Sequence, residues 1–352
     1  MPQDVEMQEG PTRRDRPLHR PAGSGRRPPA VLFARPAWRA ALAALLIAAS
    51  ALGSPATAES PRPDDLEALR AAALDAVNRD RRRHDLPALS PEPAAEAAAQ
   101  AHAADMLARD YFAHRSPEGG TVADRHQEAG GSRWRLTAEN IARCEACTPP
   151  ADRDRVERLQ EGWMNSPEHR ANILRRGLSG FGFGLAASRS GGLYAVQAFA
   201  GPGTPRGLSS GETASAIPPD AQVRQALDRV NAARREAGHR PLDASPALTE
   251  AAASLLPASD ARDFALGDRI DLFGHLPAGA RRSWASLGML AAVCGGCGTR
   301  PTDADVAFFT GQWLDAKGRD RMMDPDATHL GFAVAANGDG KKIGLALLGT
   351  AR

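Results

Sequence analysis

The spacing of apolar residues predicts the same series of elements in each half of the chain. In the first half it predicts a helix from Pro63 to about Asp85, an alanine-rich helix from Pro93 to Arg109, and a third helix from Arg153 to Trp163. Two apolar stretches, around 179–187 and 193–200, predict strands joined by a turn. Because the helices come first and β-α-β alternation is missing, each half is predicted to be an α+β layered domain.

Landmark residues of the first half recur in the second half at a nearly constant distance. Asn78 returns as Asn231, 153 positions later, and Trp163 returns as Trp313, 150 positions later. Such a small drift over a long stretch indicates an internal repeat, and therefore two tandem copies of one domain.

Composition sets the boundaries of these copies. Residues 202–218 are rich in Gly, Pro and Ser, which is typical of a linker. We therefore expect one domain at 64–201 and a second at 219–352, preceded by an N-terminal extension and signal peptide at 1–58.

The N-terminal extension ends in a pattern typical of an export signal. Arg35 and Arg39 precede a short apolar run, Ala40–Leu52, and small residues follow up to Ala58. This run is shorter than the roughly 20 residues that span a bilayer. We expect cleavage near Ala58, a secreted or periplasmic protein, and no membrane span in the mature chain. A buried alanine-rich helix is the alternative interpretation.

The charge balance argues against a nucleic-acid partner. The chain has a net charge of +2, and residues 1–58 hold eight Arg against four acidic residues. The rest therefore carries 36 basic and 38 acidic side chains. Proteins that bind nucleic acids normally have a clear basic excess.

Three segments of the first half carry the candidate chemistry. They are Tyr111–Pro117 (YFAHRSP), Ala138–Ile141 (AENI) and Trp163–Leu174 (WMNSPEHRANIL), and GFGFG and YAVQAF follow them. In order and spacing these segments closely resemble the CAP superfamily, in its bacterial SCP-like branch. That superfamily groups cysteine-rich secretory, antigen 5 and pathogenesis-related 1 proteins.

The resemblance implies an α-β-α sandwich around a cleft, in a secreted protein. In the family two His and two Glu line the cleft, and in some members the His pair binds a divalent metal such as zinc. His114 and His169 match the two histidines, and Glu139 matches one glutamate. The position of the other glutamate is Ser166 here, so three of the four residues are kept.

The chemistry of these three residues leaves two interpretations open. Two neutral imidazoles can bind Zn²⁺ while a carboxylate orients one ring, so His114 and His169 are the candidate metal ligands. Alternatively, His114, Glu139 and His169 hydrogen-bond across the cleft and hold the layers together. The same three residues are the candidates for acid–base catalysis, although no nucleophile accompanies them.

The second copy is degenerate at these positions. Met289 stands where Glu139 is expected and Arg319 where His169 is expected, while His114 aligns with Gly267 or, after a shift, with His275.

The four cysteines form two C-x-x-C pairs at equivalent places: Cys144 with Cys147, and Cys294 with Cys297. In an exported protein, a local disulfide within each pair is the leading prediction. A four-cysteine zinc site joining the domains and a thioredoxin-like redox motif are the alternatives.

Two other features are discounted. Residues 207–211 match G-x-S-x-G, but they lie in the linker and lack the strand and helix of a nucleophile elbow. His102, in the middle of the alanine-rich helix, is interpreted as a core histidine.

The function expected from the sequence is binding of a small apolar ligand, an envelope component or a partner protein. A metal- or His/Glu-dependent hydrolase is one alternative, and a structural envelope protein with a vestigial cleft is another.

Overall fold

A computed structural model describes residues 5–7, 63–145, 147, 151–188, 192–208, 213–267, 269–315 and 318–352. The predicted export signal, its cleavage point near Ala58 and the Ser of the G-x-S-x-G match lie outside these residues. No helix within them is long and apolar enough to cross a membrane.

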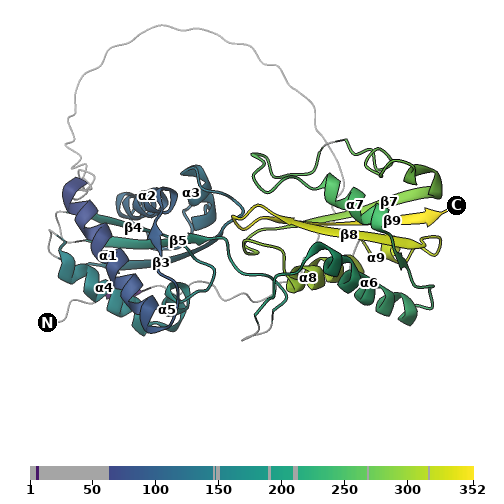
Figure 1. The fold of residues 1–352 in the computed structure, drawn as a ribbon. Coiled ribbons are helices and arrows are strands. Elements are labelled where there is room, and N and C mark those ends of the chain that lie inside the picture. The colour runs from purple at the N-terminus through teal and green to yellow at the C-terminus, as the bar shows by residue number, and fades with distance from the viewer. Residues whose placement is uncertain are drawn as a thin grey trace, which may run out of the picture.

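The first half contains helices on both faces of a sheet that is antiparallel except for a short parallel pairing at one edge (Figure 1). Its helices are α1 (Pro63–Arg83), α2 (Pro93–Arg109), α3 (Val122–Glu128), α4 (Arg153–Asn165) and α5 (Pro167–Ile173). Its strands are β2 (Ser90–Pro91), β3 (Leu136–Cys144), β4 (Gly180–Ala187) and β5 (Leu193–Gly201), and a short strand β1 (Val5–Met7) pairs with β3. The strand order is β1-β3-β5-β4-β2.

Two separate apolar clusters make the first half a three-layer α-β-α sandwich. On one face, α1 and α4 pack on the sheet around Trp163 and Phe183. On the other face, α2 packs closely on β4, because Gly182 and Gly184 lack side chains. A Cβ on Gly182 would lie 2.2 Å from the backbone of Ala95, so the GFGFG stretch is what lets this helix approach.

The second half has the same layers in the same order. Its elements are α6 (Pro219–Glu236), β6 (Asp243–Ala244), α7 (Pro246–Leu255), a 3-10 turn η1 (Ala280–Ser283), β7 (Trp284–Cys294), α8 (Asp303–Asp315), α9 (Arg319–Met322), β8 (His329–Ala336) and β9 (Lys342–Ala351). The sheet order β6-β8-β9-β7 matches β2-β4-β5-β3 of the first half. The prediction of two tandem α+β sandwiches is therefore confirmed.

A buried arginine makes an equivalent set of three hydrogen bonds in each half. Arg81 donates to the carbonyl oxygens of Pro87, Ile173 and Arg175, at 2.9, 2.7 and 3.0 Å. In the second half, Arg234 donates to the carbonyls of Arg240, Met322 and Asp324, at 2.7, 2.6 and 3.1 Å. Both side chains are fully buried, so each ties its first helix to the turn after the short helix.

The two halves touch through backbone and through the β8–β9 hairpin, which reaches the first half (Figure 1). The amide of Gly296 donates to the carbonyl of Trp134 at 2.7 Å, and that of Gly298 to the carbonyl of Pro202 at 2.8 Å. From the hairpin, the Lys341 ammonium lies 4.3 Å from the centre of the Trp134 ring. The described part of the linker thus packs against the second half.

The two cysteine pairs form local disulfides, as predicted. The Cα atoms are 5.7 Å apart in Cys144–Cys147 and 6.1 Å apart in Cys294–Cys297, within the range that disulfides span. The alternative of a four-cysteine zinc site joining the domains is wrong, because each sulfur is already bonded to its neighbour.

The apolar pattern predicts α1, α2, α4, β4 and β5 closely but misses β3, the strand between them. β3 carries Glu139 and Asn140 buried at its centre, so no alternation of apolar and polar residues marks it. The short helices α3 and α5 are also missed.

Candidate functional site

The site is built around Glu139, at the centre of β3. This strand pairs along its whole length with β5, and Glu139 lies opposite Ala198. Only 5% of the residue is exposed. A carboxylate this deep in the fold requires hydrogen-bond partners for both oxygens.

Two residues supply those partners. His114, in the loop after α2, places its Nδ1 2.9 Å from Oε1 of Glu139. Arg125, on α3, donates from Nη2 to Oε2 at 2.7 Å and also to the carbonyl oxygen of His114 at 3.1 Å. Arg125 therefore positions the carboxylate and the histidine loop together.

A capping box starts α3 immediately before Arg125. The Thr121 side chain accepts from the Asp124 amide, and the Asp124 carboxylate accepts from the Thr121 amide at 2.9 Å. This arrangement satisfies the free amides of the first turn, which fixes where a helix of only seven residues begins.

The surroundings of Glu139 keep it ionised. Burial alone would raise its pKa, but the hydrogen bond with His114 and the charge of Arg125 outweigh burial and hold the pKa of Glu139 below its ordinary value. The carboxylate is therefore an anion that accepts hydrogen bonds.

His102 lies behind this pair and has the core role expected from the sequence. Its Nε2 donates to the Ala113 carbonyl at 3.0 Å, and its Nδ1 lies 3.4 Å from the Tyr111 hydroxyl. The same Nε2 is 3.9 Å from Oε1 of Glu139. Burial, the largest influence, lowers the pKa of His102.

The second nitrogen of His114 is the atom that the site leaves available. Its Nε2 is buried and has no hydrogen-bond partner among the described residues. Since Nδ1 is held by a carboxylate, the ring has the orientation that a carboxylate gives to a metal-binding histidine. His114 thus fits a metal ligand chemically.

His169 lies on α5, a helix that packs against β3. It is buried on α5, and the Asn140 side-chain amide donates to its carbonyl at 3.2 Å. Asn172, one turn later, donates to the Glu139 carbonyl at 3.0 Å. A network of buried amides therefore fixes α5 against the strand that carries Glu139.

Ser166 occupies the position of the fourth family residue, as the N-cap of α5. Its Oγ is buried without a hydrogen-bond partner among the described residues. Within the same part of the chain, no group of three or more His, Cys, Asp and Glu side chains is arranged to hold a metal ion. The structure thus brings His114 and Glu139 into direct contact, with Arg125 as a partner that the sequence analysis missed.

Among its described residues, the second half has no comparable group at the equivalent place. Met289 stands on β7 where Glu139 stands on β3, and Arg319 begins α9. His275 is exposed, with its Nδ1 3.0 Å from the Ser254 hydroxyl. The prediction that this copy lacks the cleft residues agrees with their placement.

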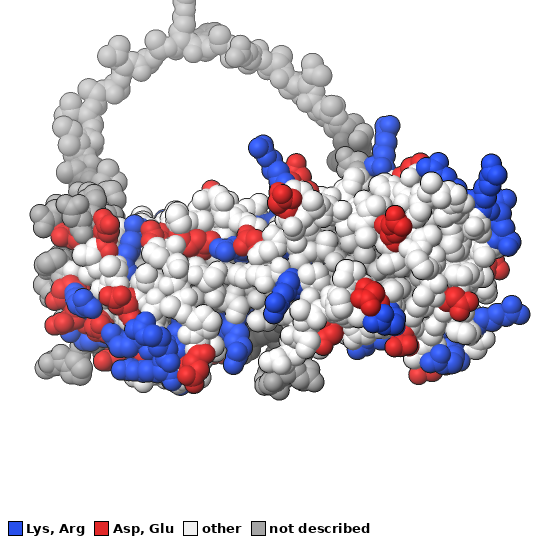
Figure 2. Space-filling view, in the orientation of Figure 1, with Lys and Arg blue, Asp and Glu red and all other residues white. Residues whose placement is uncertain are grey.

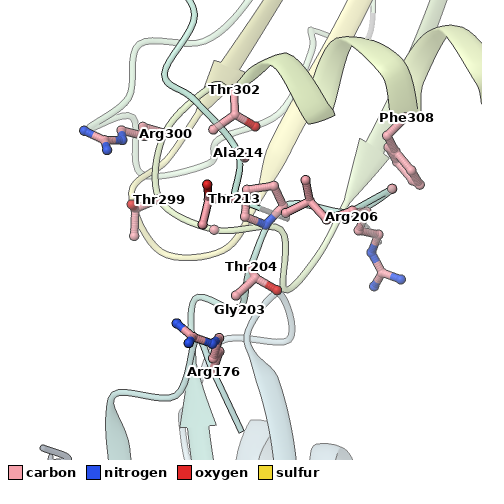
Figure 3. Close-up of a pocket in the computed structure, with 14 residues that line it drawn as sticks. Arg176, Gly203, Thr204, Arg206, Thr213, Ala214, Thr299, Arg300, Thr302 and Phe308 are labelled. Atoms are coloured by element: carbon pink, nitrogen blue, oxygen red, sulfur yellow. The ribbon is translucent and has the colours of Figure 1, made fainter. Parts of the chain in front are cut away.

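A cavity of about 860 Å³ lies between the halves, away from these residues. Arg176, Arg206 and Arg300 line it together with threonines and backbone glycines. Figure 3 shows their guanidinium groups pointing outward, Arg206 to one side and the other two to the opposite side. They do not converge on a common point, so the cavity is not a built anion site.

Surface charge on the visible face is mixed. Acidic and basic side chains alternate over the first half, around α1 and α4, without a large area of one sign (Figure 2). This face therefore offers no extended basic surface of the kind that nucleic acids require.

Several known proteins are similar to parts of this chain. YkwD of Bacillus subtilis is 30% identical over 162 residues, which is 45% of this chain and 60% of that protein. YlbC of the same organism, described as a membrane protein, is 34% identical over 113 residues, 32% of this chain and 30% of YlbC. The chain thus spans less than two thirds of either relative.

Two solved structures are also similar to parts of the chain. An extracellular protein containing an SCP domain from Bacillus anthracis is 31% identical, with 40% of this chain and 44% of that chain covered and a TM-score of 0.32. An outer surface protein from Borrelia burgdorferi is 17% identical, with 41% of this chain and 98% of that chain covered and a TM-score of 0.34.

The family comparison covers both halves. The sequence model described as CAP, the cysteine-rich secretory protein family, matches residues 74–199 and again 227–348. Together with the repeated three-layer sandwich and the His114–Glu139 pair in the first copy, these two matches show that the chain belongs to the CAP superfamily.

Proposed function

We propose that this protein is an exported binding protein whose first CAP domain, at 64–201, binds a divalent cation such as Zn²⁺ through His114 and His169. The second domain, at 219–352 after the linker 202–218, lacks the cleft residues. It provides a different surface for interaction. Export rests on the signal pattern that ends near Ala58 and on the extracellular relative from B. anthracis.

The observation that carries the metal proposal is the state of the His114 ring. Glu139 holds Nδ1 at 2.9 Å, and Nε2 is buried without a partner among the described residues. Leaving a buried ring nitrogen unsatisfied costs free energy, which metal coordination would recover. A cation there would supply a positive charge and open coordination positions for a ligand or water.

The same geometry favours binding over hydrolysis. Both oxygens of Glu139 are engaged, one by His114 and one by Arg125. A carboxylate ion-paired in this way is a poor general base, because its proton affinity is reduced. We therefore assign Glu139 the role of orienting His114.

The experiment is a calorimetric titration of the purified protein with Zn²⁺, after its cysteines have been confirmed as oxidised. We expect saturable one-to-one binding in the wild type. The double variant His114→Ala/His169→Ala should lose it, while Glu139→Gln should weaken it about tenfold, as loss of a carboxylate that orients a metal-binding histidine commonly does.

His275→Ala is the matched control, since it removes an exposed histidine of the second domain. It should bind as the wild type does. If the folded wild-type protein fails to bind Zn²⁺ saturably, or if His275→Ala and the double variant bind equally, the metal proposal is wrong.

A groove of about 690 Å³ supports an apolar ligand for the same domain. It lies between α1 and α2, and its apolar residues include Leu66, Leu74, Phe181 and Phe183. We propose this groove as the place where a small apolar molecule binds.

The fluorescent probe anilinonaphthalene sulfonate tests the groove. Ala71→Trp should reduce probe binding several-fold, because Ala71 lines the groove and a larger side chain fills it. Ala68→Trp, an exposed position on the same helix that does not line it, should leave binding unchanged. Equal binding by both variants would count against the groove.

A further inference from the structure

The last strand of the second sheet has an open edge. In the order β6-β8-β9-β7, strand β7 pairs with β9 on one side and has no hydrogen-bonded strand on its other side among the described residues. β7 is 11 residues long, the longest strand in this part of the structure. Its free edge therefore exposes a row of backbone donors and acceptors.

The equivalent edge of the first sheet accepts an antiparallel strand. There, β1 pairs with β3 in the register Val5 with Cys144 and Met7 with Ala142. β1 belongs to the predicted leader, so it serves here only to show that an edge of this geometry has room for a further strand. β7 is the counterpart of β3, and Cys294 is the counterpart of Cys144.

β7 carries none of the features that usually prevent edge pairing. Its sequence, WASLGMLAAVC, contains no charged residue and no proline. Natural edge strands commonly use both to avoid association. By contrast, β3 carries Glu139 and Arg143, which correspond to Met289 and Val293. The second copy has thus replaced charged positions with apolar ones.

These apolar residues form a strip along one face of β7. From Ser286 onward side chains alternate between faces, so a single face carries Leu287, Met289, Ala291 and Val293, whereas a bulge between Trp284 and Ser286 interrupts the alternation at the start of the strand. Ala291 is exposed. Val293 is 45% exposed, and among the described residues it is the large hydrophobic side chain that solvent reaches most. Between α7 and β7 the described chain forms only the turn η1, with no helix comparable to α3. Leu287 and Met289 are half-buried against the apolar cluster that includes Leu276 and Trp284, so Ala291 and Val293 are the exposed part of the strip.

We propose that β7 pairs antiparallel with β7 of a second copy of this chain, forming a two-fold dimer with one continuous sheet. The side-chain sizes along β7 are complementary when two copies of the strand pair in the antiparallel direction. With the axis at Met289, Leu287 lies opposite the partner's Ala291, which joins a large side chain to a small one. At the axis itself two methionines meet, and their unbranched side chains adapt to each other.

On the other face of the strand, no two large side chains meet. With that axis, Gly288 lies opposite the partner's Leu290, and Ser286 lies opposite the partner's Ala292. A two-fold axis perpendicular to the sheet also keeps both apolar strips on one face, so they merge into a single surface. No like charges meet at any position of the pairing, and the match of Leu287 to Ala291 and of Gly288 to Leu290 about one axis favours a second copy over a strand of unrelated sequence.

The test is sedimentation equilibrium of the purified protein over a wide concentration range, with three chains compared. We expect a reversible dimer in the wild type. Ala291→Lys places two charges near the axis and should raise the dimer Kd about tenfold or more, the equivalent of about 1.4 kcal/mol. The matched control is Ala232→Lys, the same change at an exposed position on α6, which should leave the Kd unchanged.

If Ala291→Lys fails to fold, Val293→Lys at the exposed end of the strip replaces it. A wild type that stays monomeric throughout, or equal Kd values for the folded β7 variant and Ala232→Lys, would overturn the proposal.

Cysteine crosslinking tests the pairing itself. Met289→Cys should form an intermolecular disulfide on mild oxidation, because each copy presents it beside the axis, and Ala232→Cys should not. A dimer in which neither Met289→Cys, Leu287→Cys nor Ala291→Cys crosslinks would contradict strand pairing through β7.

Discussion

At the scale of single residues, the charge of Glu139 depends on the motif residue His114 and also on Arg125, which no motif marks. Arg125 contacts both the carboxylate and the carbonyl of His114, and its side chain is only 11% exposed. Replacing it with glutamine leaves a buried anion with one strong partner instead of two. The pKa of Glu139 should then rise, since the largest remaining influence on it is burial.

We expect Arg125→Gln to lower the free energy of unfolding by about 2–4 kcal/mol, because breaking a buried ion pair leaves an uncompensated charge. Denaturant unfolding measures this. Arg115→Gln, an exposed arginine in the neighbouring loop, is the control and should change stability by less than about 0.5 kcal/mol. If both variants lose similar unfolding free energy, the ion pair between Arg125 and Glu139 makes no specific contribution to stability.

Two buried groups at the site predict that acid destabilises the protein. The pKa of His102 is lowered by burial, so in the unfolded chain it gains a proton that the folded protein does not bind. Stability should fall as the pH drops below the ordinary histidine value of 6.5. The pKa of Glu139 is also lowered, so a second loss begins below its ordinary value of 4.5.

His102→Gln tests the first of these losses. It should flatten the dependence of unfolding free energy on pH between the ordinary pKa values of His and Glu, whatever its effect on absolute stability. His275→Gln, at an exposed position, should keep the wild-type slope. An unchanged slope in His102→Gln would show that another group titrates there.

At the scale of elements, the repeated arginines Arg81 and Arg234 hold the first helix of each domain to a turn far away in the sequence. Each donates to three carbonyl oxygens and is fully buried. Arg81→Met should cost about 3 kcal/mol or more, because three carbonyls lose their donor inside the fold.

Arg234→Met should have a similar effect on the second domain. Arg82→Met, an exposed neighbour on the same helix as Arg81, should be nearly neutral in thermal unfolding. A small effect of Arg81→Met would indicate that water replaces the guanidinium.

Sequence reasoning could predict the elements whose stability is local. α2 ends where its apolar spacing ends, and the glycines of β4 mark the close approach of that helix. It could not predict β3, because Glu139 and Asn140 are stable inside a strand only through partners elsewhere in the chain: His114, Arg125, Gln197 and the His169 carbonyl.

For the same reason, only part of the site could be predicted from the sequence. The family motifs mark His114, Glu139 and His169, but Arg125 carries no motif. The spacing of Thr121 and Asp124 is a signal for a helix start, and Arg125 follows it directly along the chain. Only the three-dimensional structure shows that this turn faces the carboxylate.

At the scale of the whole molecule, the relation of the two domains depends on close backbone approach. Gly340, in the β8–β9 hairpin, has a φ of +95°, and a Cβ there would lie 2.9 Å from the Trp134 carbonyl and 3.0 Å from that of Pro202. Gly338, in the same hairpin, has a φ of +75°, but a Cβ there would have nothing within 4 Å. Alanine variants at these two positions therefore distinguish the effect of backbone strain from the effect of a collision between the domains.

We expect Gly338→Ala to cost about 1 kcal/mol from strain alone and to leave the domain contact intact. Gly340→Ala carries the same strain and in addition pushes the hairpin away from Trp134, so the linker should become accessible. Arg206 in the linker is a trypsin site whose guanidinium donates to the Gly295 carbonyl at 3.0 Å, across the domain contact. Cleavage after Arg206 should accordingly be several-fold faster in Gly340→Ala than in Gly338→Ala or the wild type. Equal cleavage rates in all three would mean that the hairpin does not hold the domains together, because the collision would then have been absorbed without opening the contact.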